Sequence, residues 1–465
     1  MNRHLLGVYH LLPYPARCAA AGLFGVYLDR WRYDHTTEGL VQEALEREHW
    51  TSHQWKTWRE ERLAAVLHRA ASQVPYYREQ WAERRRRGDR CSWEILENWP
   101  ILEKEELRRN PAQFLAADCD QRRMFAEHTS GTTGTPLVLW RSRETVRKWY
   151  ALHEARTRLW HQVTRHDRWA IVGGQKVVPV SQRKPPFWVW NPGSKQLYLS
   201  AFHVAPARGE SYLDALKHYK VEFILGYTAS IATLAAEALR LRRRLPMKVV
   251  VTNAEPVSDA QRSVIQEAFQ CFVRETYGMA EIVAAASECE AGYLHDWPET
   301  GFVEVAAGNE LIATGLMNTD MPLIRYRSGD RRTSPAANAS CTCGRTLPLF
   351  GTVEGRLDDV LYLRDGRQIG RMDPVLKADL PLCESQIIQE SLDRLRVRYV
   401  PATGFASSSP GEIARSIRDF IGPIDIVFEQ MEAIPREPNG KFRAVICRLP
   451  RDQRPVALPA EQVVQ

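Results

Sequence analysis

From about residue 120 the chain alternates short β-rich runs with amphipathic segments, and this alternation limits the possible folds more than any other feature. Runs at 223–227, 247–252 and 271–276 are rich in residues that favour strands, and apolar residues recur at helical spacing between them. Strands separated by helices usually pair in parallel. We therefore expect an α/β fold with mostly parallel sheets flanked by helices.

Segments on either side of this region indicate further parts. The first 110 residues or so, rich in Trp, Arg and Glu, read as a helical lead-in. After residue 300 the apolar period shortens to two, which predicts a hairpin from 302–305 and 310–314 and a β-rich subdomain. A charged stretch at 355–359 shows neither the helical nor the strand period of apolar residues, so we take it as the domain boundary. We predict a large N-terminal domain over 1–354 and a small, mobile α+β domain over 355–465.

Charge and cysteine content exclude several classes of function. The 465 residues carry a formal charge of +7, which is too dilute for a nucleic-acid-binding surface. Nine cysteines, an odd number, argue against a disulfide framework and favour a reducing compartment, so we expect a cytoplasmic protein. No apolar run is long enough to cross a bilayer. The oligomeric state stays open, a homodimer included.

The strongest local motif is a Gly/Thr-rich run at 128–136 that ends in Pro136. Glycines let backbone N–H groups approach an oxyanion, and hydroxyl side chains donate to phosphate oxygens. The motif lacks the Gly-Lys-Ser/Thr ending of a Walker loop. On composition alone, a surface turn is the more common explanation.

Three later segments place polar residues where a ligand would need them. Tyr277–Glu281 follows a predicted strand and so lies at the carboxyl end of a parallel sheet, where ligands bind in α/β folds. Tyr326–Asp330 ends another apolar run with a carboxylate that suits sugar hydroxyls, and Gly355–Asp359 stands at the predicted boundary. Each segment alone is weak evidence, whereas their order along the chain is specific.

In this order the segments resemble the adenylate-forming (acyl-CoA synthetase-like) superfamily, within it the phenylacetate–CoA ligase branch, and most closely its CapK-like members. The resemblance runs from Val74–Arg78 to about residue 445. It implies ATP-dependent activation of a carboxylic acid, an aryl acid among the candidates, to an acyl-adenylate with release of pyrophosphate. The acyl group would then pass to a thiol such as coenzyme A. Two alternatives stay open: transfer to an amine to form an amide, and a non-catalytic nucleotide-binding scaffold.

The resemblance also assigns roles to residues. It gives phosphate binding to the loop of Thr129, Ser130, Gly131, Thr132, Thr133, Gly134 and Thr135. It gives the adenine pocket to Asn253, Ala254, Glu255, Tyr277 and Gly278. Asp330 would bind the ribose, Arg356 would approach the nucleotide, and Asp358 would be the hinge of the small domain.

Four residues are expected to take part in the reaction itself. Glu281 would hold Mg²⁺, a hard cation that prefers carboxylate oxygens. Lys441, in a carboxy-terminal loop typical of the superfamily, and Thr133 would stabilise charge on the phosphates. His203 is a candidate either for catalysis or for lining the acyl pocket. Leu137 stands where many superfamily members have a lysine, and the phenylacetate branch also lacks the lysine there.

Cys289 and His295, together with the Cys-x-Cys pair Cys341 and Cys343, could form a separate metal site. Three thiolates and one imidazole are the ligands of a closed, tetrahedral, structural zinc site. Four unrelated loop residues are the alternative, because the Cys-x-Cys spacing is not diagnostic. Similar Cys/His positions in the branch favour zinc, which would lie outside the reaction.

Overall fold

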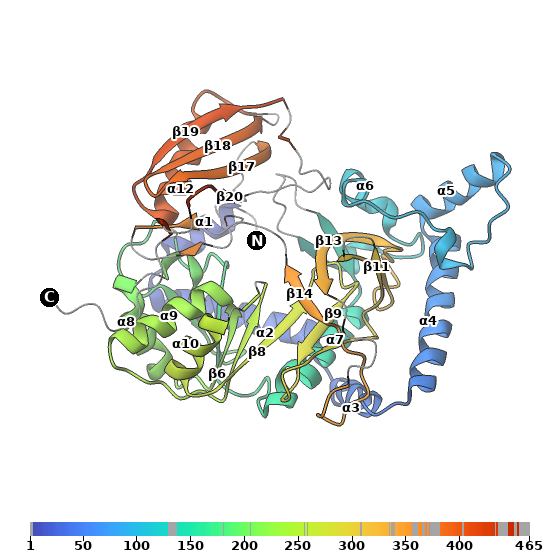
Figure 1. Ribbon diagram of the computed structural model, residues 1–465, viewed down its shortest axis with the longest axis horizontal. Coiled ribbons are helices and arrows are strands. Elements are labelled where there is room, and N and C mark those ends of the chain that lie inside the picture. Colours follow the sequence, from blue (N-terminus) through green and yellow to red (C-terminus); the bar gives the residue numbers. More distant parts are fainter. Residues whose placement is uncertain are drawn as a thin grey trace.

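The computed structural model describes residues 3–128, 137–179, 181–204, 206–254, 256–257, 259–306, 309–333, 335, 340–355, 361–364, 368–369, 372, 382–401, 404–432, 434–435, 445–450 and 453–454. Its lead-in is helical, as predicted, and consists of α1 (Arg3–Leu11), α2 (Tyr14–Arg32), α3 (Thr37–Arg47), α4 (Ser52–Gln73), α5 (Pro75–Arg86) and α6 (Lys104–Arg109). Helix α4 starts at a capping box in which Thr51 accepts from the backbone N–H of Gln54. Figure 1 shows α4 and α5 extending along one side of the molecule.

The central sheet confirms the predicted parallel α/β architecture. Its eight strands have the order β10-β9-β8-β7-β6-β3-β5-β4. Neighbouring strands from β5 to β8 pair in parallel, whereas β4 at one edge and β9 and β10 at the other pair antiparallel. The strands are β3 (Trp169–Gly173), β4 (Trp188–Asn191), β5 (Gln196–Ser200), β6 (Phe223–Tyr227), β7 (Val249–Asn253), β8 (Phe272–Gly278), β9 (Ala285–Glu288) and β10 (Leu294–Asp296).

Helices cover this sheet and bury its apolar side chains. Helices α8 (Pro206–His218), α9 (Thr228–Arg240) and α10 (Asp259–Phe269) pack on one face, where Ile224, Val250 and Ile231 belong to a single buried cluster (Figure 1). Ile231 and Leu234 show the predicted helical period and are 1% exposed. Elsewhere α2 packs against β4 and α7 (Arg143–His153). The apolar pattern that predicted these elements is therefore the pattern that forms the core.

A π-helical turn, η4 (Glu154–Arg158), extends α7, and all five of its residues are buried. Arg156, with no exposed side-chain surface, donates to both carboxylate oxygens of Glu299, at 2.7 and 2.8 Å. Its Nε also lies 3.5 Å from Glu48. Such buried charges are tolerated because each is paired. The turn thus ties the lead-in, through Glu48, to the segment that carries Glu299.

Two smaller sheets complete the large part of the chain. The predicted hairpin is present as β11 (Gly301–Ala306) and β12 (Glu310–Gly315), which continue antiparallel to β13 (Tyr326–Thr333) and β14 (Thr352–Gly355). The strands β1 (Phe125–His128) and β2 (Val138–Arg141) flank the Gly/Thr-rich run and pair antiparallel. Leu102 bridges to Tyr326 and so joins the lead-in to the β-rich region.

The carboxy-terminal part contains a second α/β layer. Strands β17 (Leu382–Ser391) and β18 (Arg394–Pro401) pair antiparallel, β19 (Asp425–Gln430) pairs parallel to β18, and β20 (Val445–Cys447) pairs parallel to β17. Helix α12 (Ser409–Ile421) packs on them, and the short strands β15 (Leu361–Tyr362) and β16 (Gln368–Ile369) pair nearby (Figure 1). Phe202 joins this core, with its ring centroid 5.2 Å from that of Phe420. The division of the chain at residue 355 stays a prediction.

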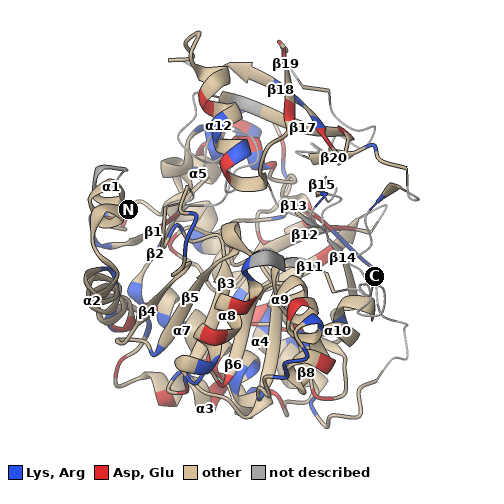
Figure 2. Cartoon of the chain, turned by 90° about the vertical axis from the view of Figure 1, so that its left-hand side faces the viewer, with Lys and Arg blue, Asp and Glu red and all other residues tan. Residues whose placement is uncertain are grey.

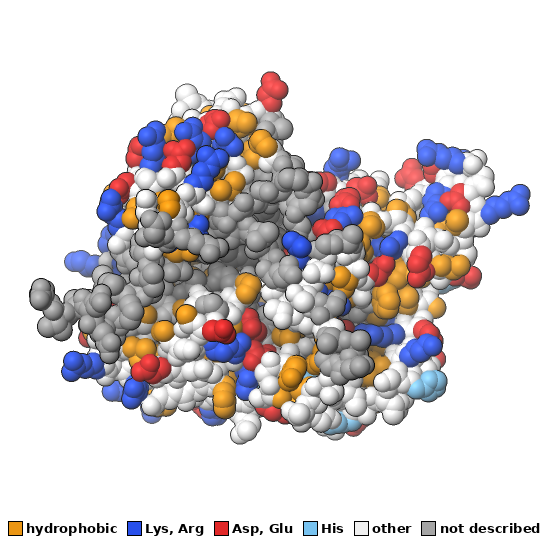
Figure 3. Space-filling model, in the orientation of Figure 1, with side chains coloured by type: hydrophobic (Ala, Val, Ile, Leu, Met, Phe, Trp, Pro, Cys, Tyr) orange, Lys and Arg blue, Asp and Glu red, His pale blue; other side chains and the backbone are white. Residues whose placement is uncertain are grey.

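The surface agrees with the low net charge. Figure 3 shows basic and acidic side chains interspersed over one face, including the part formed by α12 and β17–β19. Arg396 and Arg398, for example, both contact Glu429. Of the described helices, none is long and apolar enough to cross a membrane.

Candidate functional site

The carboxyl ends of the parallel strands meet at one edge of the central sheet. Register pairs Gly173 with Ser200, and Tyr227 with Asn253, so these strand ends lie side by side. Strand β8 ends at Gly278, beside β7. The predicted adenine-pocket residues Asn253, Tyr277 and Gly278 therefore share an edge, as expected for an α/β ligand site.

Two residues at this edge have backbone conformations with positive φ. Gly226 has φ +155°, and a Cβ on it would lie 2.2 Å from the carbonyl oxygen of Val172, so only glycine fits. Ala254 takes the left-handed conformation with φ 66°, which turns the chain sharply after β7. Asn253 Oδ1 is buried and has no hydrogen-bond partner in the described part of the chain. A buried acceptor of this kind suits a ligand that brings its own N–H donor.

Two hydrogen bonds, each from a tyrosine hydroxyl to a carboxylate, connect β13 to β8 and the residues just after it. The hydroxyl of Tyr277, on β8, donates to Asp330 Oδ2 on β13 at 2.8 Å. The hydroxyl of Tyr326, on β13, donates to Glu281 Oε1 just after β8 at 2.9 Å. Asp330 is 8% exposed and Glu281 7% exposed. The crossed pair therefore holds two nearly buried carboxylates in fixed orientations at the same end of β8.

A lysine that the sequence reasoning missed also reaches this site. Lys104, the first residue of α6, places Nζ 3.3 Å from Glu281 Oε1. Its sequence context, a charged run at the start of a helix, carries no motif that separates it from surface lysines. Tyr326 lies in a segment that the sequence singled out, but its contact with Glu281 depends on how β13 and β8 pack. Only the three-dimensional structure shows these two partners.

Several predicted site residues lie outside the described residues. They are Thr129, Ser130, Gly131, Thr132, Thr133, Gly134, Thr135, Glu255, Arg356, Asp358 and Lys441. Strands β1 and β2 bring the two ends of the Gly/Thr-rich run together, since His128 pairs with Val138. The roles of these eleven residues stay predictions.

His203 sits in a packed environment. Its ring stacks on Phe187 with 4.8 Å between centroids, Nδ1 lies 2.9 Å from Ser200 Oγ, and the side chain is 1% exposed. The nearby Trp188 and Trp190 lie against Tyr212 and Tyr219 of α8 and its end. These contacts are those of packed side chains, and the catalytic role of His203 stays a prediction.

The four predicted metal ligands do come together. One ligand atom from each of Cys289, His295, Cys341 and Cys343 lies within 4.8 Å of the others. Cys289 Sγ is 3.5 Å from Cys341 Sγ, and Cys343 Sγ is 3.5 Å from His295 Nε2. Thiolates at tetrahedral corners about 2.3 Å from zinc would lie roughly 3.8 Å apart, close to these distances. The donor set and its spacing therefore fit a structural zinc ion.

The surroundings of this cluster orient its ligands. His295 Nδ1 lies 3.0 Å from the carbonyl oxygen of Leu347, an arrangement that makes Nδ1 the donor and leaves Nε2 facing the cysteines. Arg345, two residues beyond Cys343, pairs with Glu48 of the lead-in at 3.0 Å. A metal here would fix the loop that carries Cys341 and Cys343 against both the sheet and the lead-in.

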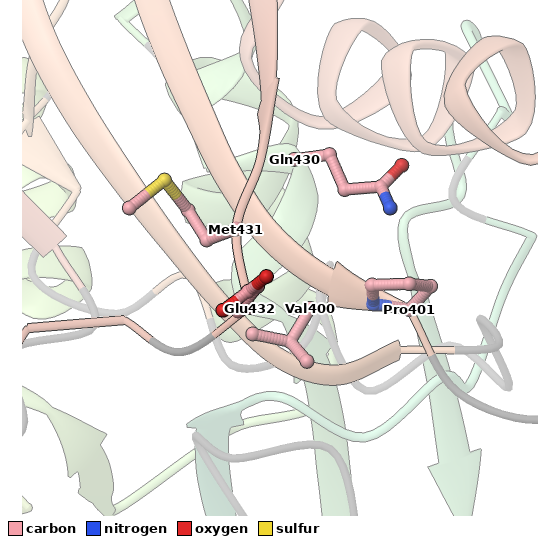
Figure 4. A pocket seen from close by; sticks show the side chains of 5 residues that line it. All are labelled: Val400, Pro401, Gln430, Met431 and Glu432. Atoms are coloured by element: carbon pink, nitrogen blue, oxygen red, sulfur yellow. The ribbon is translucent and has the colours of Figure 1, made fainter.

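A depression of about 500 Å³ lies elsewhere, at the ends of β18 and β19. Figure 4 shows its lining side chains, which are Val400, Pro401, Gln430, Met431 and Glu432. None of the predicted site residues is among them. The strand-edge site and this depression are therefore different places.

Comparison with known proteins identifies homologues along most of the chain. The sequence model of the CapK C-terminal domain matches residues 361–448. Protein CapK of Staphylococcus aureus is 27% identical over 370 residues, which are 75% of this chain and 79% of that protein. The phenylacetate–coenzyme A ligase of Aromatoleum evansii is 25% identical over 430 residues, 84% of this chain and 94% of that protein.

Solved structures share the fold. A 2-hydroxyisobutyryl-CoA ligase in complex with 2-HIB-AMP and CoA, in the thioesterification state, matches with a TM-score of 0.54 and 19% identity over 86% of this chain and 91% of its own. The same ligase in the postadenylation state with R3-HIB-AMP matches with a TM-score of 0.52 and 20% identity over 87% and 92%. The fold is thus that of these adenylate-bound ligases.

Proposed function

We propose that this chain, a homologue of CapK and of the phenylacetate–CoA ligases, is an AMP-forming carboxylate ligase. It activates a carboxylic acid with ATP to an acyl-adenylate, releases pyrophosphate, and passes the acyl group to a thiol such as coenzyme A. The observation that carries this proposal is the crossed Tyr277–Asp330 and Tyr326–Glu281 pair at the carboxyl edge of the sheet. It fixes two nearly buried carboxylates beside the carboxyl ends of parallel strands, where α/β folds bind ligands.

The described residues fit ATP by their chemistry. Asp330, held by Tyr277, accepts hydrogen bonds and suits the ribose hydroxyls. Asn253 Oδ1, buried and unpartnered within the described residues, suits the exocyclic amine of adenine.

Adenylation requires positive charge around the phosphates. A substrate carboxylate oxygen attacks the α-phosphorus, the bond from that phosphorus to the bridging oxygen breaks, and pyrophosphate takes the electron pair. Glu281 is a hard oxygen donor that suits Mg²⁺, which when bound would offset charge on the phosphate oxygens. Lys104 lies against the same carboxylate and adds a fixed positive charge. Lys441 and the 129–135 loop supply further donors in this proposal.

The second half-reaction requires that a thiol reach the acyl-adenylate. The acyl-adenylate is a mixed anhydride, and a thiolate attacks its carbonyl carbon while AMP leaves. The small domain, 355–465 with its hinge at Asp358, would turn to withdraw Lys441 and admit the thiol. An amine in place of the thiol would yield an amide, and the acceptor assay below separates the two.

A structural zinc ion held by Cys289, His295, Cys341 and Cys343 is part of the proposal. Its support is the mutual approach of four ligand atoms within 4.8 Å. Cys18, Cys91, Cys119 and Cys271 are free thiols, which supports a reducing compartment such as the cytoplasm.

Acid-dependent exchange of labelled pyrophosphate into ATP tests the first half-reaction. We expect exchange with at least one member of a panel of aliphatic and aryl acids, and strong loss of exchange in Lys441→Ala with nucleotide binding retained. No exchange with any acid would favour a nucleotide-binding scaffold. Addition of coenzyme A or of amines to the responding acid then identifies the acceptor by the increase in turnover.

A further inference from the structure

The first two helices expose an unusual amount of apolar surface. Seven of the eleven large hydrophobic side chains that are exposed in the described residues lie between positions 5 and 27. On α1, Leu5, Val8 and Leu11 recur at helical spacing and are 63%, 62% and 86% exposed. On α2, the large hydrophobic side chains of Leu23, Phe24, Val26 and Tyr27 are exposed as well. Isolated exposed leucines are ordinary, but a cluster on two consecutive helices indicates an interaction surface.

The opposite sides of these helices are anchored to the body of the protein. Tyr9 donates through its hydroxyl to the carbonyl oxygen of Val177 at 3.1 Å, and His10 Nε2 lies 2.8 Å from that of Lys176. On α2, Gly22 and Gly25 are buried and pack so closely on Pro192 and Asn191 that a Cβ would clash there. Figure 2 shows both helices along one edge of the molecule. The apolar sides therefore point away from the body and cannot turn inward.

We define the N-terminal apolar face by six of these side chains. They are Leu5, Val8, Leu11, Leu23, Phe24 and Tyr27. Phe24 and Tyr27 are 57% and 50% exposed, and their rings stack with 6.0 Å between centroids. Aromatic side chains of this kind favour the boundary between hydrocarbon and water.

The charges around the N-terminal apolar face indicate which kind of partner it binds. The first 28 residues contain no aspartate or glutamate, and their Arg17 is 8% exposed and turned toward Gln182. Arg30 at the end of α2 is exposed, and so is Lys184 in the loop whose Gln182 contacts Arg17. An apolar stripe bordered by basic residues complements anionic headgroups above hydrocarbon.

We propose that the N-terminal apolar face binds the surface of an anionic lipid bilayer, with α1 and α2 lying in the plane of the interface. Leucine and aromatic side chains enter the boundary between headgroups and acyl chains, while the exposed Arg30 and Lys184 meet lipid phosphates. Because no described helix is able to span a membrane, binding is peripheral. The inference is independent of the acid that the ligase activates.

Sedimentation of the full-length protein with vesicles tests the proposal. We expect binding to vesicles that contain phosphatidylglycerol, weaker binding to phosphatidylcholine alone, and a decrease as salt rises. The combined variant Leu23→Ser, Phe24→Ser, Tyr27→Ser should lower binding by about tenfold or more, because each substitution removes apolar contact with the bilayer. The matched control Ile95→Ser, Phe272→Ser changes side chains that are 52% and 65% exposed elsewhere and should bind as the native protein does.

Other outcomes would overturn the proposal. Native protein that stays in the supernatant with both kinds of vesicle would do so, and so would a combined variant that sediments as well as the native chain. A native dimer that the combined variant converts to monomers, without vesicle binding by either, would assign the face to a second copy of the chain. Thermal melts of both variants establish that each is folded, so a loss of binding reports on the surface itself.

Discussion

The crossed tyrosine–carboxylate pair makes a specific prediction for nucleotide binding. Tyr277→Phe keeps the ring, whose centroid lies 5.1 Å from that of Phe350, and removes only the hydroxyl that donates to Asp330. Asp330 is 8% exposed, so water replaces the lost donor poorly. The carboxylate should then lose the orientation that it needs for the ribose.

The expected size of the effect follows from the type of bond. A hydrogen bond to a charged group contributes about 1.5–3 kcal/mol. If this free energy is lost from ATP binding, affinity falls by about 10- to 100-fold, since each 1.4 kcal/mol is a factor of ten. Titration calorimetry with ATP measures the affinity, and pyrophosphate exchange at saturating ATP measures turnover. Turnover should change little, because the Tyr277 hydroxyl takes no part in bond making.

Tyr326→Phe is the matched control. It removes an equivalent hydroxyl, 2.9 Å from Glu281, and leaves Asp330 untouched. We expect it to alter the Mg²⁺ concentration needed for exchange and to leave the affinity for metal-free ATP nearly unchanged. Native ATP affinity in a folded Tyr277→Phe variant would refute the assignment of Asp330 to the ribose.

Three further predictions concern stability and metal content. Cys343→Ser should lower the zinc content measured by plasma emission spectroscopy and lower the melting temperature, and native protein purified without zinc that contains no metal would contradict the site. Arg156→Met should destabilise the protein by about 3–5 kcal/mol in urea unfolding, because Glu299 is left charged and buried, and Glu299→Gln in the same chain should recover part of this loss. Burial lowers the pKa of His153 to about 3. The contribution of the neutral His153 to stability is therefore present above pH 6.5 and is lost progressively as the pH falls from 6.5 toward 3. Between pH 7 and pH 5 the native protein should lose about 2 kcal/mol more than His153→Leu, and an equal loss in both would mean that His153 is not buried neutral.

The sequence predicted the sheet well because its signal is local. The run 223–227 is β6 without change, and the hairpin at 302–314 formed as its period of two required. Alternating strands and helices were enough to indicate parallel pairing, since few other arrangements bury both kinds of apolar pattern. The Cys/His cluster was also predicted, although only folding brings Cys289 and Cys341, 52 residues apart, to 3.5 Å.

Side-chain partners between distant strands were not predictable in the same way. Glu281 and Asp330 stood out from their segments, but the exchange of tyrosines between β8 and β13 depends on the register of two sheets. Lys104 reaches Glu281 from a helix 177 residues earlier, and no local pattern marks such a contact. The exposure of the N-terminal apolar face likewise depends on which sides of α1 and α2 find partners in the body.

The π-helical turn η4 has a consequence for how this chain tolerates insertions and deletions. A π turn accommodates one residue more than an α-helix of the same rise. Insertion or deletion of a residue in the regular part of α7 ahead of this turn would instead rotate the turn by about 100° relative to the residues before it. Arg156 would then point away from Glu299, whereas Arg158 and Glu154 would turn together. A surface loop absorbs such a change in length without effect. At this position the same change would separate two paired charges, Arg156 and Glu299, in the protein interior.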